Sequence, residues 1–232
     1  MQDYIILDYD GTIHDTMRIY KKAFLKAYEW LVQEGKAARR EFDDSQISRW
    51  LGFNSKEMWN TFMPTLEEEY KTKASGMIGE FMVQQVIQGG ASLYDGAEKV
   101  LEELKRDGNR LIFLSNCKEA YRDVHRRFFG LDRFFDDFYC CETYDFIPKG
   151  DIIPYILKEH PGNYLAIGDR GSDFVAARQN GIPFIACLYG FGSRKEYEMA
   201  EKFANDVKEL PGLVRSLRTV KNSLKLNEKS VE

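Results

Sequence analysis

The amino-acid sequence predicts an α/β fold: a Rossmann-like parallel sheet core with an inserted all-helical domain. Short β-prone runs alternate with amphipathic helical segments after residue 95, which is the pattern of parallel βαβ units. A first buried strand at residues 4–7 meets an abrupt polar turn, as expected where both faces of a sheet are covered. Residues 15–90 show helical periodicity alone, which indicates that the helical domain follows the first strand.

Length and composition fit this architecture and exclude several classes of function. The 232 residues suffice for one large domain with an insertion, and 44% apolar against 30% charged residues is typical of a protein with a packed core. Lys and Arg total 33 against 37 for Asp and Glu, so we expect no nucleic-acid partner. No apolar run approaches the roughly 18 residues that a spanning helix requires, so we expect no stable membrane insertion.

The cysteines and the first residues of the chain predict a cytoplasmic protein. Cys117, Cys140, Cys141 and Cys187 follow no metal-ligand spacing, and we expect reduced thiols in a reducing compartment. The segment before the first strand has no secretory-signal pattern. Composition does not define an oligomeric state, which stays open.

A long helical stretch follows the first strand. Apolar residues recur there at helical spacing in four groups, which predicts about four helices. The last of these helices ends at Gly89 and Gly90. We therefore divide the chain into an α/β catalytic core at residues 1–14 and 91–212, a helical cap at residues 15–90 and a basic C-terminal tail at residues 213–232.

Four further strands are predicted after residue 95, each preceded by a helix. The helices are expected at residues 98–105, 118–129, 151–160 and 172–180. The strands are expected at residues 110–114, 138–141, 164–167 and 183–188, the last of these closing the sheet. Nearly all crossovers between parallel strands are right-handed, so we expect these helices to pack back onto the sheet.

The tail at residues 213–232 carries five Lys or Arg residues against two Glu residues. Its apolar residues recur on one side of a predicted helix. A basic amphipathic helix can bind a membrane or an acidic partner. We favour the simpler interpretation, a terminal helix that packs on its own domain.

Polar residues stand after the predicted strands, where ligands bind in open parallel sheets. Four aspartates, a hydroxyl, an amide and an ammonium group make up the set: Asp8, Asp10, Ser115, Asn116, Lys149, Asp169 and Asp173. Acidic groups from distant segments repel one another unless a cation lies between them, and Mg²⁺ is a natural ion for oxygen ligands. The sequence therefore predicts a magnesium site beside a phosphate-binding site.

Four motifs in this order resemble those of the haloacid dehalogenase-like (HAD) hydrolase superfamily. They are Asp8-Tyr9-Asp10-Gly11-Thr12, Ser115 at a strand end, Lys149 in Ile147-Pro148-Lys149-Gly150, and Gly168-Asp169-Arg170-Gly171-Ser172-Asp173. The resemblance covers about residues 4 to 190. With its helical insertion, the sequence is similar to phosphoglycolate phosphatase-like members, in which a helical cap closes over the site. True dehalogenases lack the second aspartate, so Asp10 favours phosphoryl transfer.

The resemblance implies a role for each aspartate. Asp8 is implied as the nucleophile that forms an aspartyl-phosphate, and Asp10 as the group that protonates the leaving group and then activates water. These tasks need opposite protonation states, for which we expect a drier environment around Asp10. Mg²⁺ is expected on Asp8, on the backbone carbonyl of Asp10 and on Asp169. Asp173 is expected to complete this metal site by orienting its waters or Lys149.

The same resemblance implies the phosphate-binding groups. The Ser115 hydroxyl and the Asn116 N–H are expected to take the phosphoryl oxygens, while Lys149 offsets charge. Thr12 is assigned to the same site and is expected to bond near the Asp8 carboxylate. The family often has proline after the lysine, whereas this chain has Gly150.

Substrate selection in these relatives depends on a cap loop after the second cap helix, here residues 51–56. Arg49, Asn54 and Lys56 are our candidates for contacts with the leaving group. β-Phosphoglucomutases tend to have a lysine where this chain has Leu51, which disfavours a mutase. We interpret four other conspicuous residues as packing residues: Tyr9, His14, Trp50 and Trp59.

The expected function is that of an Mg²⁺-dependent phosphomonoester hydrolase that acts on a small phosphorylated metabolite through an aspartyl-phosphate. Phosphoglycolate is a family-level example of such a substrate. Two alternatives stay open. One is a phosphomutase of the β-phosphoglucomutase type, and the other is a non-catalytic regulatory or scaffolding protein with the basic tail as its contact.

Overall fold

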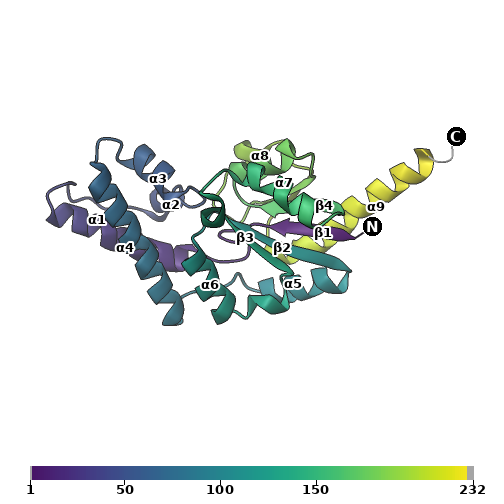
Figure 1. Cartoon of the computed structure of the whole chain (residues 1–232), viewed down its shortest axis with the longest axis horizontal. Coiled ribbons are helices and arrows are strands. Elements are labelled where there is room, and N and C mark those ends of the chain that lie inside the picture. Colours follow the sequence, from purple (N-terminus) through teal and green to yellow (C-terminus); the bar gives the residue numbers. More distant parts are fainter. Residues whose placement is uncertain (1, 229–232) are drawn as a thin grey trace.

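Six parallel strands form one sheet in the computed structural model, which describes residues 2–228 (Figure 1). The strands are β1 Asp3–Leu7, β2 Asn109–Ser115, β3 Asp137–Cys140, β4 Asn163–Gly168, β5 Phe184–Cys187 and β6 Lys202–Ala204. Their order across the sheet is β3-β2-β1-β4-β5-β6. The α/β class and the Rossmann-like parallel sheet predicted from the sequence are confirmed.

The register of the central strands sets the position of the residues that follow them. Leu7 at the end of β1 lies opposite Phe113 of β2 and Ile167 of β4. The carboxyl ends of these three strands therefore reach the same edge of the sheet. Asp8, Ser115 and Asp169 stand at or just after these ends, so pairing alone brings them to one edge.

Helices cover both faces of the sheet (Figure 1). The helices of this part are α5 Ala97–Arg106, α6 Glu119–Phe128, α7 Lys149–Glu159, α8 Gly171–Gln179 and α9 Leu210–Glu228, with short 3-10 helices at Leu131–Arg133, Cys141–Tyr144, Arg194–Tyr197 and Val207–Glu209. Side chains of α5, α6 and the start of α9 share a cluster with Ile5 and Leu7, whereas those of α7 and α8 cluster with Ile6. Each face needs its own apolar side chains, which explains the continuous apolar run of β1.

Between β1 and α5 the chain forms four helices to one side of the sheet (Figure 1). They are α1 Met17–Gln33, α2 Asp44–Ser48, α3 Ser55–Phe62 and α4 Glu68–Ile87. The long helices α1 and α4 pack on each other and bury Phe24 and Leu31 of α1 and Ile78 of α4. The short helices α2 and α3 each begin with a capping box, at Asp43 and Asn54, which satisfies their first backbone N–H groups.

The connections into and out of this helical segment lie side by side. The Asp15 N–H donates to the Ser92 carbonyl at 3.0 Å, and the Tyr94 N–H donates to the Ile13 carbonyl at 2.9 Å. The two connections therefore pair with each other beside the end of β1. The chain leaves the sheet region and returns to it at one place.

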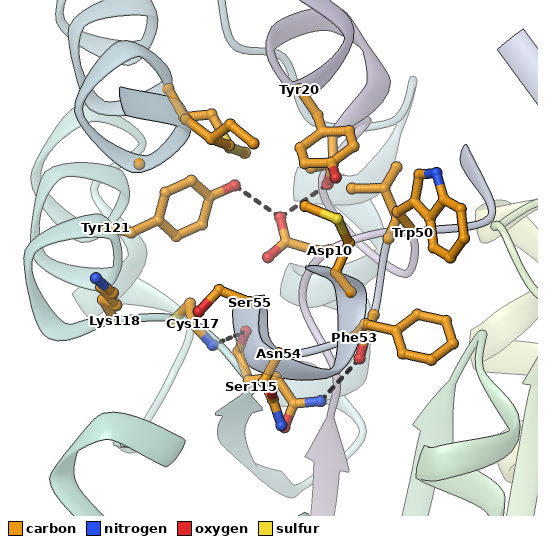
Figure 2. Close-up of a pocket in the computed structure, with 18 of the residues that line it drawn as sticks. Asp10, Tyr20, Trp50, Phe53, Asn54, Ser55, Ser115, Cys117, Lys118 and Tyr121 are labelled. Carbon is orange, nitrogen blue, oxygen red and sulfur yellow. Dashed lines mark hydrogen bonds between the residues drawn. The ribbon is translucent and has the colours of Figure 1, made fainter. Parts of the chain in front are cut away.

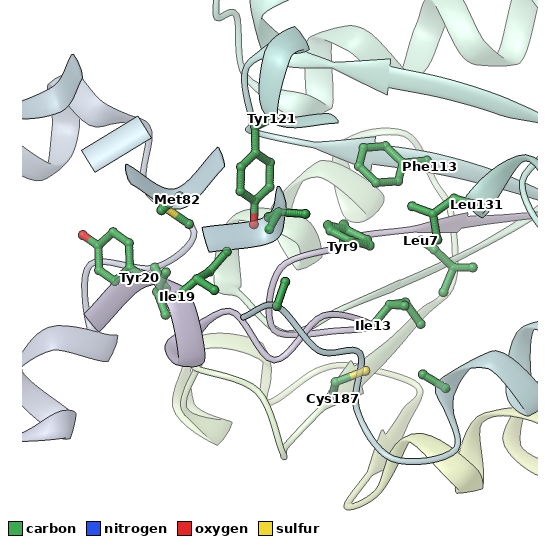
Figure 3. Close-up of a cluster of buried hydrophobic side chains, with 14 of the residues drawn as sticks. Leu7, Tyr9, Ile13, Ile19, Tyr20, Met82, Phe113, Tyr121, Leu131 and Cys187 are labelled. Atoms are coloured by element: carbon green, nitrogen blue, oxygen red, sulfur yellow. The ribbon is translucent and has the colours of Figure 1, made fainter. Parts of the chain in front are cut away.

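One hydrophobic cluster extends from the sheet into the helical segment (Figure 3). It contains Leu7 of β1 and Phe113 of β2, and it continues through Tyr121 of α6 to Ile19 of α1 and Met82 of α4. Burial of this continuous apolar surface holds the helical segment against the sheet.

The sequence prediction ends the sheet one strand too early. After β5, which was expected to be last, β6 adds an edge strand in which Phe203 lies opposite Ala186. With three residues, Lys202–Ala204, β6 is too short to show an alternating or continuous apolar pattern. Such short edge strands expose few unpaired backbone groups.

The C-terminal helix begins before the predicted tail and packs on the core at its start. Leu210 and Val214 are buried, and Arg215 donates to Glu103 and Asp107 at 2.8 Å each. This part of the tail agrees with the packed interpretation. Arg218 lies 3.3 Å from a carboxylate oxygen of Asp3. The other basic residues of the predicted tail, Lys221, Lys225 and Lys229, lie outside the described side chains. Across residues 2–228, no helix has both the length and the apolar character to cross a membrane.

Candidate active site

Three buried aspartates meet at the carboxyl edge of the sheet. Asp8 follows β1, Asp169 follows β4, and Asp173 lies in the first turn of α8. One carboxylate oxygen of each lies within 4.8 Å of the others. Parallel pairing brings the first two to the same edge, and Asp173 lies beside them because α8 begins directly after Asp169 and Arg170. The structure thus brings together three of the four aspartates predicted for the metal site.

The ammonium group of Lys149 lies between two of these carboxylates. Its Nζ donates to Oδ1 of Asp8 at 2.5 Å and to Oδ1 of Asp173 at 2.7 Å. Oδ2 of Asp173 accepts the backbone N–H of Arg170 at 3.1 Å, so both of its oxygens are engaged. Burial lowers the pKa of Lys149, but the two carboxylates outweigh burial and raise it above the usual value. The lysine is therefore charged and bridges Asp8 and Asp173.

Burial and mutual repulsion make this cluster a strong acceptor of positive charge. Burial, together with the charge of Asp173, raises the pKa of Asp8 to about 7 despite the attraction of Lys149. Burial and the charge of Asp8 likewise raise the pKa of Asp169 well above its usual range. Three carboxylates face one ammonium group in the described part of the chain, so the cluster favours a further proton or a metal ion. Carboxylate oxygens are ligands that hard divalent ions prefer.

The turn after Asp8 depends on Gly11. Its φ of +88° lies in the left-handed region, which side chains disfavour. A Cβ at this position would also lie 2.3 Å from Oδ2 of Asp169. Glycine is therefore required both for the backbone conformation and for the close approach of Asp169.

We expect the Gly11→Ala variant to lose about 1–3 kcal/mol of stability from backbone strain alone, with a further loss of activity because Asp169 must move. Gly35→Ala is the matched control, since Gly35 has φ +68° but nothing within 4 Å of a built Cβ. The comparison uses denaturant unfolding together with phosphate release. Equal effects of the two substitutions on both measurements would show that the contact with Asp169 is unimportant.

Thr12 lies beside two of the carboxylates. Its hydroxyl lies 3.3 Å from Oδ2 of Asp8 and 3.5 Å from Oδ1 of Asp169, and the residue is fully buried. The expected bond near Asp8 is present. Its assignment as a phosphate-binding residue stays a prediction, and the buried hydroxyl is turned toward the carboxylates.

Asp10 is held through a single oxygen. Its Oδ1 accepts a hydrogen bond from the hydroxyl group of Tyr121 (Figure 2) and another from that of Thr16, at 2.7 Å each. The same oxygen lies 3.0 Å from Nδ1 of His14. Burial alone would raise the pKa of Asp10, but the bonds and charge of His14, with the bond from Tyr121, outweigh it and lower the pKa. Oδ2 of Asp10 has no hydrogen-bond partner among residues 2–228 and stays open to a ligand.

The environments of the two aspartates are the reverse of the prediction. The Asp8 side chain is 8% exposed and that of Asp10 is 19% exposed, so Asp8 is the drier of the two. The physical reason is their place in the chain: Asp8 is enclosed at a strand end beside Asp173, whereas Asp10 stands in a turn that is supplied with hydrogen-bond donors.

Sequence analysis missed three residues that hold Asp10: His14, Thr16 and Tyr121. His14 does pack, since its ring stacks on Tyr9 with centroids 5.3 Å apart, but it also contacts the Asp10 carboxylate. His14 and Thr16 follow Asp10 by four and six positions, a spacing that a turn could have indicated. Tyr121 is 111 residues away and gave no signal.

Ser115 and Asn116 end β2 and connect it to the helical segment. The Ser115 hydroxyl oxygen is buried and accepts the Cys117 N–H at 3.2 Å. The Asn116 side chain donates from Nδ2 to the Gly52 carbonyl at 3.0 Å, and its Oδ1 accepts the Cys141 thiol at 2.8 Å. Asn116 therefore joins the strand end to the loop before α3.

Arg170 makes a second contact with that loop. Its guanidinium donates to the Leu51 carbonyl and lies 3.4 Å from a carboxylate oxygen of Glu196. A Cβ on Gly52 would lie 2.6 Å from Cγ of Arg170, so the loop approaches the arginine closely. The loop is thus held against the carboxyl edge from two sides.

A cavity of about 440 Å³ lies between the sheet edge and the helical segment (Figure 2). On the sheet side its lining contains the predicted residues Asp8, Asp10, Ser115, Asn116, Lys149 and Asp173, whereas Asp169 is fully buried outside the lining. On the other side, α1, α3, α4 and the loop before α3 close it. Ligand sites are commonly 300–1,000 Å³, so the cavity can enclose a small organic molecule with one end at the carboxylates.

Of the three residues predicted to select the substrate, one lines the cavity and two do not. Asn54 lines the cavity, but its side chain caps α3 by accepting the Glu57 N–H at 2.9 Å. Arg49 and Lys56 are exposed and lie outside the lining, and their role in substrate selection stays a prediction. The lining residues of this loop include instead the aromatic side chains Trp50 and Phe53.

Comparison with known proteins adds an independent observation. The family described as haloacid dehalogenase-like hydrolase has a sequence model that matches residues 5–187. The chain belongs to this family. The resemblance predicted from the four motifs is therefore confirmed, and the chain is a hydrolase of the haloacid dehalogenase-like type.

Individual relatives are distant. A curated 5'-nucleotidase from Pseudomonas aeruginosa is 26% identical over 199 residues, which cover 83% of this chain and 85% of the relative. A predicted phosphatase from Clostridium acetobutylicum has a similar structure, with a TM-score of 0.80, 23% identity, and coverage of 93% of this chain and 99% of that chain. A predicted phosphoglycolate phosphatase from Haemophilus somnus has a TM-score of 0.76 and 17% identity over 92% and 98% of the two chains. These two structures share the fold of this haloacid dehalogenase-like hydrolase.

Proposed function

We propose that this chain is an Mg²⁺-dependent phosphatase that cleaves a small phosphomonoester through an aspartyl-phosphate on Asp8. The observation that carries the proposal is the buried group of Asp8, Asp169 and Asp173, with Lys149 bridging two of them beside a cavity. Membership of a hydrolase family and a relative named as a 5'-nucleotidase are consistent with this reaction.

In the first step, a carboxylate oxygen of Asp8 attacks the phosphorus of the bound ester. A bond forms between this oxygen and phosphorus, and the bond from phosphorus to the leaving alcohol breaks. The charge of Lys149, 2.5 Å from Asp8, favours the ionised nucleophile and offsets charge on the transferred group. Ser115 and Asn116, at the end of β2, take the phosphoryl oxygens in this proposal.

Asp10 moves the protons. Its open Oδ2 donates a proton to the departing oxygen, while Thr16, Tyr121 and His14 hold Oδ1 in place. The pKa of Asp10 is low in the free protein, but a phosphate dianion bound beside it favours the protonated form. After the alcohol leaves, Oδ2 takes a proton from the water that attacks phosphorus. The bond to Asp8 then breaks, which releases inorganic phosphate.

Mg²⁺ fits the donors that this site offers. Asp8 and Asp169 supply buried carboxylate oxygens with raised pKa values, and the Asp10 carbonyl accepts no backbone hydrogen bond from residues 2–228. Both oxygens of Asp173 are already engaged, so we assign Asp173 to positioning Lys149. When bound, the ion supplies Lewis-acid stabilisation of charge on the phosphoryl oxygens.

We expect Mg²⁺ to stabilise the folded protein as well as to support turnover. Binding to the folded state alone contributes about 2.7 kcal/mol at a concentration of 100 times the dissociation constant. Thermal unfolding in MgCl₂ and in EDTA measures this effect, and the Asp169→Asn variant is expected to lose most of it. Asp132→Asn, at an exposed residue paired with Arg126, is the control that keeps it. Phosphate release from p-nitrophenyl phosphate that continues unchanged in EDTA would reject the metal.

In this proposal, the helical segment at residues 15–90 acts as a cap over the core formed by residues 1–14 and 91–212. The contacts of Asn116 and Arg170 with the loop before α3 keep the cavity covered during the first step and must open for exchange of ligands. All four cysteines are free, which is consistent with the cytoplasmic location that we propose.

The same assays test the two alternatives. Leu51, where related mutases tend to have a lysine, is buried and uncharged, so no observation favours a phosphomutase. The protein would be a phosphomutase if it converts a sugar phosphate into its isomer faster than it releases inorganic phosphate. A regulatory or scaffolding protein would release no phosphate from any phosphomonoester in the presence of Mg²⁺.

A further inference from the structure

The two walls of the cavity differ in chemistry. The sheet edge contributes charged groups, among them Asp8, Asp10 and Lys149. The wall formed by the helical segment is mainly apolar and aromatic, and it includes Tyr20, Trp50, Phe53, Met58, Ile78 and Met82. If the phosphoryl group of a substrate binds at the sheet edge, its leaving group therefore lies against the apolar wall.

The helical wall offers no positive charge to a ligand. Among the cavity-lining residues of the segment 15–90, which the structure describes completely, the one charged side chain is that of Glu80. Lys118 and Arg170 also line the cavity but belong to the core, and Arg170 is already engaged with the Leu51 carbonyl and Glu196. A carboxylate or a second phosphate on the leaving group would lose water at this wall without gaining a cation.

Trp50 and Phe53 offer ring surface at the same wall. Their ring centroids lie 6.2 Å apart with an interplanar angle of 61°, and Phe53 keeps 38% of its surface exposed. Figure 2 shows both rings on one side of the pocket, with Tyr20 and Tyr121 nearer to Asp10. Trp50 is half-buried, and an aromatic ring that keeps part of its surface exposed gains from contact with a flat apolar partner.

We infer from these features that the leaving group of the natural substrate is an uncharged alcohol that carries a flat ring, as in a nucleoside 5'-monophosphate or an aryl phosphate. The inference rests on the phosphatase activity proposed above and adds the substrate class. The ester phosphate lies at Asp8, and the ring lies against Trp50 and Phe53. The Glu80 carboxylate, on the same wall, accepts hydrogen bonds from hydroxyl or amino groups of the leaving group.

The test compares four phosphomonoesters through kcat/KM for release of inorganic phosphate. Thymidine 5'-monophosphate and 2-deoxyribose 5-phosphate differ by the base alone, phenyl phosphate represents aryl esters, and 2-phosphoglycolate carries a second anionic group. We expect thymidine 5'-monophosphate to exceed 2-deoxyribose 5-phosphate and 2-phosphoglycolate by about tenfold or more, the usual effect of one stacking partner. Comparison with phenyl phosphate distinguishes a nucleoside from an aryl leaving group.

Substitutions in the loop before α3 test whether this loop causes the preference for a substrate with a ring. Phe53→Ala is expected to lower the ratio of kcat/KM for thymidine 5'-monophosphate over 2-deoxyribose 5-phosphate by about tenfold. Trp50→Leu keeps an apolar side chain without the flat ring and is expected to lower the same ratio. Phe128→Ala is the matched control, because Phe128 is 44% exposed on α6 and lies outside the cavity lining. This control is expected to leave the ratio unchanged.

Three results would overturn the inference, and they fall into two kinds. A higher kcat/KM for 2-phosphoglycolate would show that the core wall binds a second anionic group of the substrate, and loss of this preference in Lys118→Ala would identify Lys118 as the group that binds it. The phosphatase proposal would stay intact. If Phe53→Ala and Trp50→Leu leave the ratio of kcat/KM for thymidine 5'-monophosphate over 2-deoxyribose 5-phosphate unchanged, the loop before α3 does not recognise the base. This result would also leave the phosphatase proposal intact. Release of phosphate from none of the four esters in Mg²⁺ would overturn the proposed function itself.

Discussion

The Asp8→Asn variant is expected to lose phosphate release by roughly 10⁴-fold or more while it keeps its fold. A carboxamide has nearly the shape of a carboxylate but cannot serve as the nucleophile toward phosphorus. The substitution also removes one negative charge from a buried group of three carboxylates, in which burial first and then the charge of Asp173 raise the pKa of Asp8 to about 7. We therefore expect the melting temperature without Mg²⁺ to stay the same or to rise.

Steady-state phosphate release and thermal unfolding, measured on the same preparations, check this expectation. Asp132→Asn makes the same chemical change at an exposed position paired with Arg126 and should behave as the unmodified protein. An Asp8→Asn protein with full turnover would mean that another group attacks phosphorus. An unfolded variant would show instead that the carboxylate is needed for stability.

The Lys149→Met variant is expected to lose both stability and turnover. The ammonium group is 6% exposed and lies 2.5 Å from Asp8 and 2.7 Å from Asp173, so its removal leaves two buried carboxylates without their cation. Breaking a buried ion pair in this way costs about 3–5 kcal/mol. Asp8 then takes up a proton more readily and is a poorer nucleophile, and we expect turnover to fall roughly 10²- to 10³-fold.

Denaturant unfolding with and without Mg²⁺ separates these two effects. We expect Mg²⁺ to restore part of the stability, because it also offsets the carboxylates, but not the turnover, because the positive charge of Lys149 is still missing. Lys158→Met on the same helix is the control, since Lys158 is exposed. If Lys149→Met keeps the turnover of the unmodified protein, Lys149 has no role in the reaction.

Most of the site could be predicted because neighbouring parallel strands end at one edge of a sheet. Asp8 and Asp169 each stand directly after an apolar strand, and the register of β1 with β4 brings them together. Lys149 was grouped with the polar residues expected after the strands, and its motif also resembles that of the family, but no strand ends directly before it in the structure. Its position at the start of α7 explains how it reaches Asp8 from another element.

The rest depended on features that sequence patterns do not carry. Tyr121 reaches Asp10 from α6 because two elements pack together, and no spacing along the chain encodes that contact. Which residues of the loop before α3 line the cavity depends on how this loop packs against the core, where Asn116 and Arg170 contact it. The burial of Asp8 relative to Asp10 likewise depends on which donors the folded chain brings near each carboxylate.

Detection of phosphate on Asp8 is the direct test of the proposed aspartyl-phosphate. The protein is mixed with phenyl phosphate and Mg²⁺, quenched in acid during turnover, digested and examined by mass spectrometry. We expect a peptide in which Asp8 carries one added phosphoryl group that hydroxylamine removes, and no such peptide from the Asp8→Asn variant. Rapid turnover with the phosphoryl group on a different residue, or with none on the protein at any quench time, would contradict this proposal.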